Sequence, residues 1–439
     1  MADVTHLRTA AEAGLGQLFD RLKGGLPGDV AVREEALAGF AARGLPHRRI
    51  EEFKYTDLRA LMREAHPPAE RPGPADLATA FGQARAFAEV GAARLTFVNG
   101  HFATELSELA ALPAGIDATT LGDALSARHP LLPLIGAVAL ARDNPVVALN
   151  TAFMADGVVI RVPAGLVVEQ PVHLRFLNVS PAAFSTATRI LVVVEEGASI
   201  TILESHEGPS GLSYQPNGMV EFVADDRSTV RHVRLNAEGA NALALSTVTA
   251  KLGAEVSFNS LNVVVGSSVS RHQVFATFVG EGSRARFDGA SMLGARQHAD
   301  ATLVIDHAVP HCISREMFKT VLDGESVGVF QGKIIVRPHA QKTDGAMKSN
   351  ALLLGAGATM NNKPELEIFA DDVVCGHGAT CGALDEDLLF YLKSRGLPPP
   401  EAESLLVQAF LGEAIEGVEH EGAREALVGV IEGWLRARG

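Results

Sequence analysis

The stretch Ile190-Leu-Val-Val-Val-Glu-Glu-Gly-Ala-Ser-Ile200 shows the pattern that decides the fold. Aliphatic, mostly β-branched residues are followed by an acidic turn with glycine, a small residue and the start of another strand. The turn and its strand recur at intervals of 26 to 33 residues, apart from one interval of 42, at Asp226–Val230, Leu252–Val256, Glu281–Ala285, Asp323–Val327 and Ala356–Met360. Coils of this length cannot bury their apolar faces alone, so the repeat predicts a stacked β-solenoid.

An antiparallel β-sandwich with irregular hairpins would also contain short strands of this kind. A strand and turn that return at similar intervals favour the solenoid over the sandwich. We therefore expect a mainly β protein with an N-terminal helical and mixed α/β domain over residues 1–150, a β-helix core over residues 151–382 and a small C-terminal helical domain over residues 383–439.

Composition narrows the class of protein. Of the 439 residues, 47% are hydrophobic and 21% are charged, and the net charge is −14. This acidity argues against a free nucleic-acid binder, which normally presents a basic face. Three cysteines are too few for a disulfide framework and fit a reducing compartment. The first residues contain no signal-peptide pattern, and no apolar run reaches about 18 residues. We expect a cytoplasmic protein that is not embedded in a membrane.

The best chemical candidate is the segment Asp371-Asp-Val-Val-Cys375-Gly-His377-Gly-Ala-Thr-Cys381-Gly. Residues two apart on a strand share a face, so Cys375 and His377 would project together. A thiolate and an imidazole can bind iron or zinc, or form a nucleophile and base. Two ligands are too few for a closed site, so others would come from elsewhere in this chain or from another chain. The alternative is a small buried cysteine beside a hydrogen-bonded turn histidine.

The other cysteines are weaker candidates. Cys381 would lie on the face of Cys375 only if the strand ran unbroken past Gly378, which two nearby glycines argue against. His311 and Cys312 are adjacent and would point to opposite faces of a strand, so a structural role is favoured. The sequence contains no phosphate-binding loop, no Rossmann fingerprint and no zinc-protease or serine-hydrolase motif.

The C-terminal helices carry a surface for docking. One short helical unit cannot bury Leu388, Leu389, Tyr391 and Leu392 together unless it packs on the end of the solenoid or on a partner. Both interpretations fit these residues equally well.

Several of these segments resemble the SufB/SufD family of iron–sulfur cluster assembly proteins. The resemblance spans nearly the whole chain and rests on the segments Arg49–Leu58, Val329–Val336, Ala340–Asp344, Lys363–Asp372, Cys375–Thr380 and Leu384–Gly396. The chain is similar to the SufD branch rather than the SufB branch, because it reads His377-Gly-Ala-Thr where SufB-like chains read His-Glu-Ala-Thr. It also has Ala358 at the position that aligns with a SufB cysteine.

The resemblance implies a right-handed parallel β-helix and a scaffold without catalytic activity of its own. It implies that the chain pairs with SufB through the two β-helices and docks the SufC ATPase, in which the ATPase activity resides, through the C-terminal helices. Cys375 and His377 would be half of a site for a transient iron–sulfur cluster that SufB completes, with Cys381 as an auxiliary ligand. Flavin is a further expected component of the complex, with no site in this sequence, and the free chain is expected to pair with a second copy. The residues expected to contact SufC are Leu388, Leu389, Phe390, Tyr391, Leu392, Arg395 and Phe410.

Two other classes of function remain open on the sequence. A β-helix enzyme acting on polysaccharides would normally carry a secretion signal and an outer cluster of acids. A purely structural interaction protein would keep the cysteine and histidine for packing alone.

Overall fold

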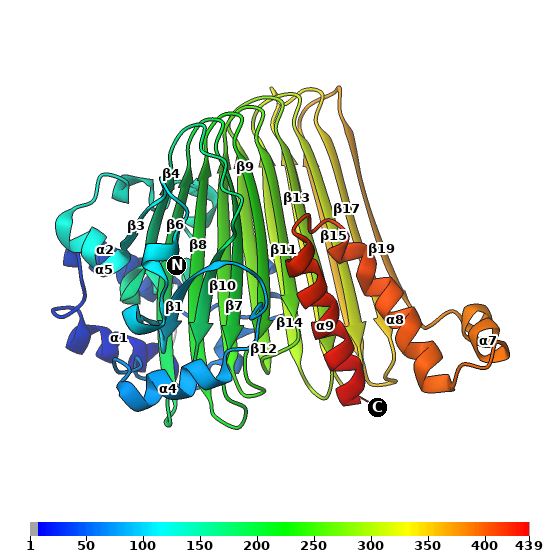
Figure 1. Cartoon of the computed structure of the whole chain (residues 1–439). Helices are drawn as coiled ribbons and strands as arrows, with labels where there is room; N and C mark the ends of the chain where they lie inside the picture. The colour runs from blue at the N-terminus through cyan, green and yellow to red at the C-terminus, as the bar shows by residue number, and fades with distance from the viewer. Residues whose placement is uncertain (1–7, 439) are drawn as a thin grey trace, which may run out of the picture.

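The computed structural model describes residues 8–438 and contains two long sheets that face each other (Figure 1). The N-terminal helical pattern was expected to begin near Thr5, which lies outside the described residues. One sheet is built from even-numbered strands after its antiparallel first strand, β3: β3 (Asp117–Thr120), β4 (Asp156–Val162), β6 (Phe184–Val194), β8 (Tyr214–Ala224), β10 (Leu243–Leu252), β12 (Val269–Phe278), β14 (His298–His307), β16 (Val327–Val336) and β18 (Thr359–Ile368).

The opposite sheet, here called the odd sheet, alternates with this even sheet along the chain. Its strands are β2 (His101–Phe102), β1 (Ala93–Val98), β5 (Val172–Leu177), β7 (Ser199–Glu207), β9 (Thr229–Ala237), β11 (Ser257–Val264), β13 (Arg284–Leu293), β15 (Ile313–Leu322), β17 (Asp344–Leu353) and β19 (Val374–Gly382). From β4 onward every pairing within a sheet is parallel. The chain therefore winds as a parallel β-solenoid, which confirms the expected fold class.

One coil of the solenoid takes 27 to 31 residues, as successive register partners show: Ser199, Thr229, Ser257, Arg284, Ile313, Asp344 and Val374. The interval of 42 residues in the sequence repeat has a topological cause. The first four turns of the repeat lead from the even to the odd sheet, whereas the turns at Asp323 and Ala356 lead back from odd to even. The sequence pattern thus changes edge of the solenoid after about one and a half coils.

The turns from the even to the odd sheet share a left-handed residue. Its φ lies between 56° and 77° at six successive positions, namely Gly197, Arg227, Glu255, Gly282, His311 and Lys342. Only two of these are glycine, so the other side chains accept a conformation that costs an L-residue roughly 1 kcal/mol. The gain is a backbone ladder, because N–H groups such as that of Arg227 donate to the carbonyl of the next coil, here Ala254 at 2.7 Å.

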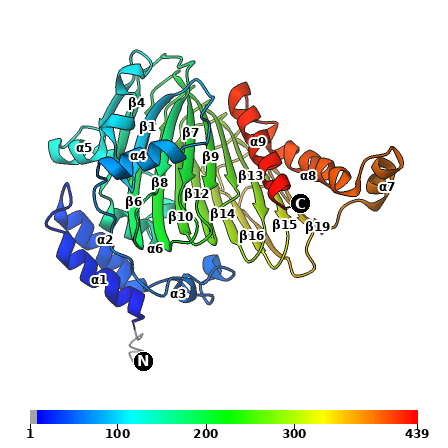
Figure 2. The ribbon, with the colours of Figure 1, turned by 60° about the horizontal axis from the view of Figure 1, so that its bottom comes forward.

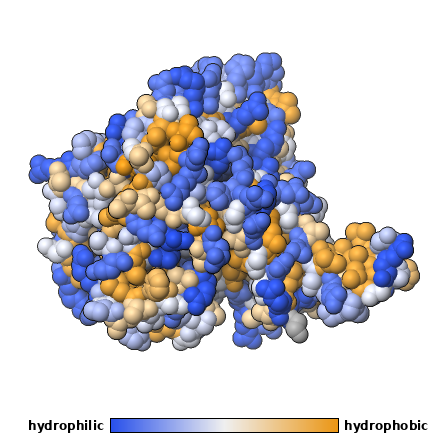
Figure 3. All heavy atoms as spheres, in the orientation of Figure 1, coloured by the Kyte–Doolittle hydropathy of each residue, from blue (hydrophilic) through white to orange (hydrophobic). Residues whose placement is uncertain are grey.

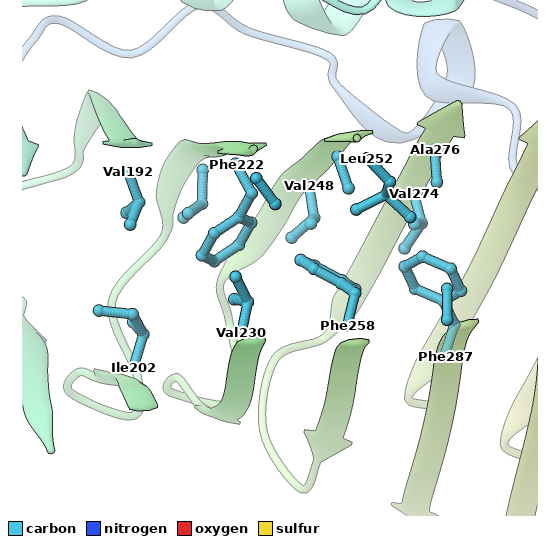
Figure 4. Packing of buried hydrophobic residues seen from close by; sticks show 14 of the residues in the cluster. Val192, Ile202, Phe222, Val230, Val248, Leu252, Phe258, Val274, Ala276 and Phe287 are labelled. Carbon is cyan, nitrogen blue, oxygen red and sulfur yellow. The ribbon is translucent and has the colours of Figure 1, made fainter. Parts of the chain in front are cut away.

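The space between the sheets is filled by side chains from alternate positions of both. Phe222, Phe258 and Phe287 interleave there with β-branched residues of neighbouring strands (Figure 4). Phe258 lies 5.4 Å from Phe222 and 5.5 Å from Phe287, centroid to centroid. Because each coil buries its inner face only against the coils beside it, the last coil is the one without a neighbour.

Helices cover the outer faces and the N-terminal end. The N-terminal set is α1 (Ala10–Leu22), α2 (Val30–Arg43), α3 (Leu58–Leu61), α4 (Pro74–Gln83), α5 (Leu121–Ala127) and α6 (Pro145–Phe153), with 3-10 turns at Glu51–Phe53, Thr104–Leu106, Leu109–Ala111, Leu132–Leu134 and Ala139–Ala141. Strands β1 to β3 lie within the expected N-terminal domain, yet β1 pairs with β5 and β3 with β4. The first coils are thus built in part by the N-terminal region.

The C-terminal helices are α7 (Glu386–Ser394), α8 (Pro399–Ile415) and α9 (Glu421–Arg438). Helices α8 and α9 run across the outer face of the odd sheet (Figure 1), where Leu411 and Leu427 pack on Val233 and Leu261. The sequence predicted that Pro398–Pro400 end a helix, but Pro399 and Pro400 form the first turn of α8. Proline is accepted there because the first turn leaves its N–H groups without an intrahelical partner. Among the described helices, none combines the length and apolar character needed to cross a bilayer.

Candidate functional site

The last coil of the solenoid carries Cys375 and His377. Both lie on β19, the terminal strand of the odd sheet, in register with Gly345 and Met347 of β17. Met347 belongs to the buried core between the sheets, so this register places Cys375 and His377 on the inner face as well. Because strand neighbours two apart share a face, the two side chains project together, about 7 Å apart along the strand.

The two side chains differ in how far they are covered. Cys375 is half-buried and packs against the core, with its Sγ 3.6 Å from the position that a Cβ on Gly345 would take. His377 is exposed, because no further coil follows β19. Burial raises the pKa of the Cys375 thiol and the carboxylates of Asp344 and Glu316 add to the rise, while the Gly345 backbone opposes it. The thiol is therefore protonated at neutral pH unless a cation stabilises the thiolate.

Cys381 and Cys312 lie apart from this pair. The strand continues unbroken from Val374 to Gly382, contrary to the expectation that its glycines interrupt it, so Cys381 shares the face of Cys375. Six residues of extended strand separate the two sulfurs by about 20 Å, too far for a single metal ion or small cluster. Cys312 is fully buried, with its Sγ directed at the carbonyl of Gly280, and His311 is the left-handed turn residue before it. The structural role expected for Cys312 fits this position.

Helix α7 forms an arm that projects beyond the solenoid (Figures 1 and 2). Described residues of α7 are not buried, and the exposed fractions are 51% for Leu388, 72% for Phe390 and 53% for Tyr391. Arg395 lies over the Tyr391 ring at 5.1 Å. Figure 3 shows apolar surface beside charged residues on this arm. Of the seven residues expected to contact SufC, Leu389 and Leu392 are half-buried, and so is Phe410, under Lys319 of the solenoid at 4.6 Å.

A docking segment that sequence reasoning left without a structural role crosses the even sheet. The stretch Arg49–Leu58, here called the strap, lies along the outer face of β12, β14 and β16 (Figure 2). Arg271 of β12 donates to the Glu52 carbonyl at 2.8 Å and lies 3.9 Å over the Phe53 ring, and it pairs with Asp300 of β14. Both charged side chains are buried.

The strap continues to the last coil. Gln331 of β16 donates to the same Glu52 carbonyl at 3.1 Å, and Lys363 of β18 contacts Glu51 at 2.7 Å. The N-terminal segment therefore reaches the strand opposite β19. The only sequence signal was the unusual density of charged and aromatic residues in what would otherwise be a linker.

The interior of the first coils is polar as well as aliphatic. His206 and His232 lie 2.5 and 2.9 Å from the two carboxylate oxygens of Glu204, and Arg234 donates to the same group at 3.2 Å. Although burial opposes it, the hydrogen bonds of the two histidines hold the pKa of Glu204 well below its usual range. A detectable sequence signal was present, because these residues continue the alternation of Ile200 and Ile202 along β7.

Fold and site together define a parallel β-solenoid whose terminal coil is uncovered and presents a thiol beside an imidazole. Family models support the same class: residues 176–410 match "SUF system FeS cluster assembly, SufBD core domain" and residues 29–174 match "SufBD protein N-terminal region".

Curated relatives agree. The chain is 33% identical to an iron–sulfur cluster assembly SufBD family protein of Synechocystis over 89% of this chain and 87% of that one. It is 28% identical to the iron–sulfur cluster assembly protein SufD of Escherichia coli over 90% of each, and 30% identical to the chloroplastic protein ABCI7 of Arabidopsis thaliana over 66% of this chain and 62% of that one. The chain belongs to the SufBD family of iron–sulfur cluster assembly proteins, as the sequence motifs predicted.

Proposed function

We propose that this chain is the SufD-type scaffold of a cytoplasmic SufB–SufC–SufD complex, without catalytic activity of its own. The observation that carries the proposal is the uncovered last coil, which presents Cys375 and His377 on an inner face that no part of the described chain covers. An iron–sulfur cluster under assembly is the cargo of this site. A thiolate and an imidazole are suitable ligands for iron, and SufB would supply the remaining ones.

The backbone of the last coil supports docking to another β-helix. Strands β18 and β19 each pair with one neighbour only, so one edge of each has N–H and C=O groups with no strand beside them. Phe369 and Val374, at the turn between these strands, are 60% and 72% exposed. Edges of this length and polarity are templates for pairing with another chain. A SufB β-helix fits this edge, and in the absence of SufB a second copy of the chain would use it to form a homodimer.

The projecting arm supports a second docking surface. Helix α7 contacts the remainder of the chain mainly through α8, and it exposes Leu388, Phe390 and Tyr391 on a short amphipathic helix. Clusters of exposed aromatic and aliphatic side chains of this kind mark interaction sites. We assign this surface to the SufC ATPase. We assign no residue of this chain to flavin.

The test is anaerobic cluster reconstitution on the copurified complex of this chain with SufB and SufC. Cys375→Ser and His377→Ala, made singly, should each lower the iron and acid-labile sulfide content of the complex at unchanged subunit stoichiometry. Cys381→Ser is the matched control, because it removes a thiol from the same face of the same strand about 20 Å away. Full cluster content in both variants would leave the chain as a purely structural partner.

A further inference from the structure

Glu316 of β15 is a buried carboxylate with no hydrogen-bonding partner. Its side chain is 3% exposed, and neither carboxylate oxygen has a donor among the described residues. Ser314, two residues earlier on the same face, is also buried with a free hydroxyl. Most buried polar groups in proteins are hydrogen-bonded, so an unpartnered buried carboxyl calls for an explanation.

The register of the odd sheet places Glu316 beneath the candidate site. Glu316 pairs with Met347 of β17, and Met347 pairs with His377 of β19. In the adjacent column, Ser314 pairs with Gly345 and Gly345 with Cys375. All these residues occupy the inner face, and two strand spacings put the backbone of Glu316 about 10 Å from that of His377.

The glycine in this column leaves the path between the two levels free of a side chain. The Cys375 Sγ lies over Gly345, and the carboxylate of Glu316 is one of the charges that raise the pKa of the Cys375 thiol. The carboxyl and the thiol are therefore electrostatically coupled through the interior, although they belong to different coils.

The surroundings of Glu316 favour its neutral form. Burial raises the pKa of Glu316 to about 8, and Asp288 of β13 adds to the rise, while Ser314 and Arg315 oppose it. Its register partner in β13, Phe287, is apolar, and so are the inward residues Leu303 of β14 and Phe330 of β16. His307, at the end of β14, is neutral because burial lowers its pKa to about 4.

We propose that Glu316 is a charge-compensating acid for the cation bound at Cys375 and His377. In the cation-free chain Glu316 is a neutral carboxylic acid. When ferrous iron binds in the end coil, the Cys375 thiol and the Glu316 carboxyl each lose one proton to solvent, and the two negative charges balance the divalent cation. Glu316 acts through the electric field and forms no bond to the metal. This inference rests on the proposed function of Cys375 and His377.

A structural role does not account for these observations. A glutamine would fill almost the same volume at this position without an ionisable group, and the carboxyl makes no hydrogen bond that packing would require. Unpaired buried ionisable groups raise the free energy of the folded state and are concentrated at functional sites. Charge balance for an arriving cation is the one requirement that a neutral side chain would not meet.

The first test measures the coupling without any metal. In a Cys312→Ser/Cys381→Ser background Cys375 is the only thiol, and its alkylation by iodoacetamide can be followed against pH. Glu316→Gln should react at the parent rate at pH 6.5, where Glu316 is neutral, and about threefold faster at pH 9, where the parent carboxylate holds back the thiolate. Glu367→Gln is the matched control, because Glu367 is exposed on β18 and paired with Lys333. Superimposable profiles for Glu316→Gln and its parent would overturn the inference.

The second test follows Co²⁺ binding to the full-length chain by its thiolate absorption between pH 6 and 8. Glu316→Gln should release up to one proton fewer per cation, so its affinity should rise less steeply with pH than that of the parent. An unchanged slope would overturn the role of Glu316 even if His377→Ala abolishes binding. No difference between the parent and His377→Ala would instead refute the proposed half-site itself.

Discussion

Replacing Asp300 with asparagine tests whether the strap is held to the even sheet by a buried charge pair. Arg271 and Asp300 are 1% and 0% exposed and pair directly, and Asp300 also accepts hydrogen bonds from Thr56 and Thr302. Asparagine keeps the shape and can still accept from one hydroxyl, but it leaves the Arg271 guanidinium buried without a counter-charge. Removal of one partner from a buried pair costs about 3–5 kcal/mol, so we expect a loss of that size in the free energy of unfolding.

The double variant Arg271→Met/Asp300→Leu separates the charge effect from packing. Replacement of a whole buried pair by apolar residues is often nearly neutral. The Glu52 carbonyl would keep its bond from Gln331, so we expect the double variant to lose about 1 kcal/mol for the lost hydrogen bonds. Urea unfolding followed by circular dichroism measures the global effect, and amide hydrogen exchange in residues 49–58 measures the local one.

An exposed pair gives the matched control. Asp117 and Arg161 are 66% and 38% exposed, so Asp117→Asn should cost less than about 1 kcal/mol. The reasoning fails if Asp300→Asn costs no more than Asp117→Asn, or if the double variant is as unstable as Asp300→Asn alone. Either result would mean that Arg271 finds water or another partner and that the strap is held by Phe53 and its backbone contacts.

Three further predictions concern separate parts of the molecule. Because folding raises the Glu316 pKa from about 4.5 to about 8, the wild type should lose about 3 kcal/mol of stability between pH 4.5 and 7 that Glu316→Gln keeps; equal pH dependence in urea unfolding would refute this. Phe390→Asp, on a side chain that is 72% exposed, should leave the melting temperature unchanged and weaken SufC capture at least tenfold, whereas tight capture would exclude α7 as the docking surface. Gly157→Ala would put a Cβ 1.8 Å from the Arg189 carbonyl oxygen and should abolish soluble expression, while Gly294→Ala, with open space around it, should not; normal yields of both would refute the clash.

The solenoid could be predicted because its determinants are local. Each turn combines an acidic or glycine residue with a small residue, and each strand that follows is rich in β-branched side chains, so short windows of sequence carry the signal. The family motifs then fixed the fold class. The edge at which a turn lies is not local information, and for this reason the interval between Glu281 and Asp323 could not be interpreted from sequence.

The candidate site was predictable in part for the same reason. Cys375 and His377 are two residues apart, so one strand is enough to place them on a common face. Glu316 is some 60 residues away in sequence and lies beneath them only through the register of three strands. The strap depends on still longer connections, because Arg271 and Lys363 meet it from strands of different coils.

The two ends of the solenoid are finished in different ways, and this asymmetry bears on function. At the N-terminal end, β2 and β3 run antiparallel to their neighbours and close both sheets. At the C-terminal end the chain has three helices available, but α8 and α9 turn back along the outer face of the odd sheet and α7 projects away. A helix placed over β18 and β19 would have satisfied their edges and buried Cys375 and His377. The C-terminal helices cover the side of the solenoid instead, and the inner face of its last coil is left to a partner chain.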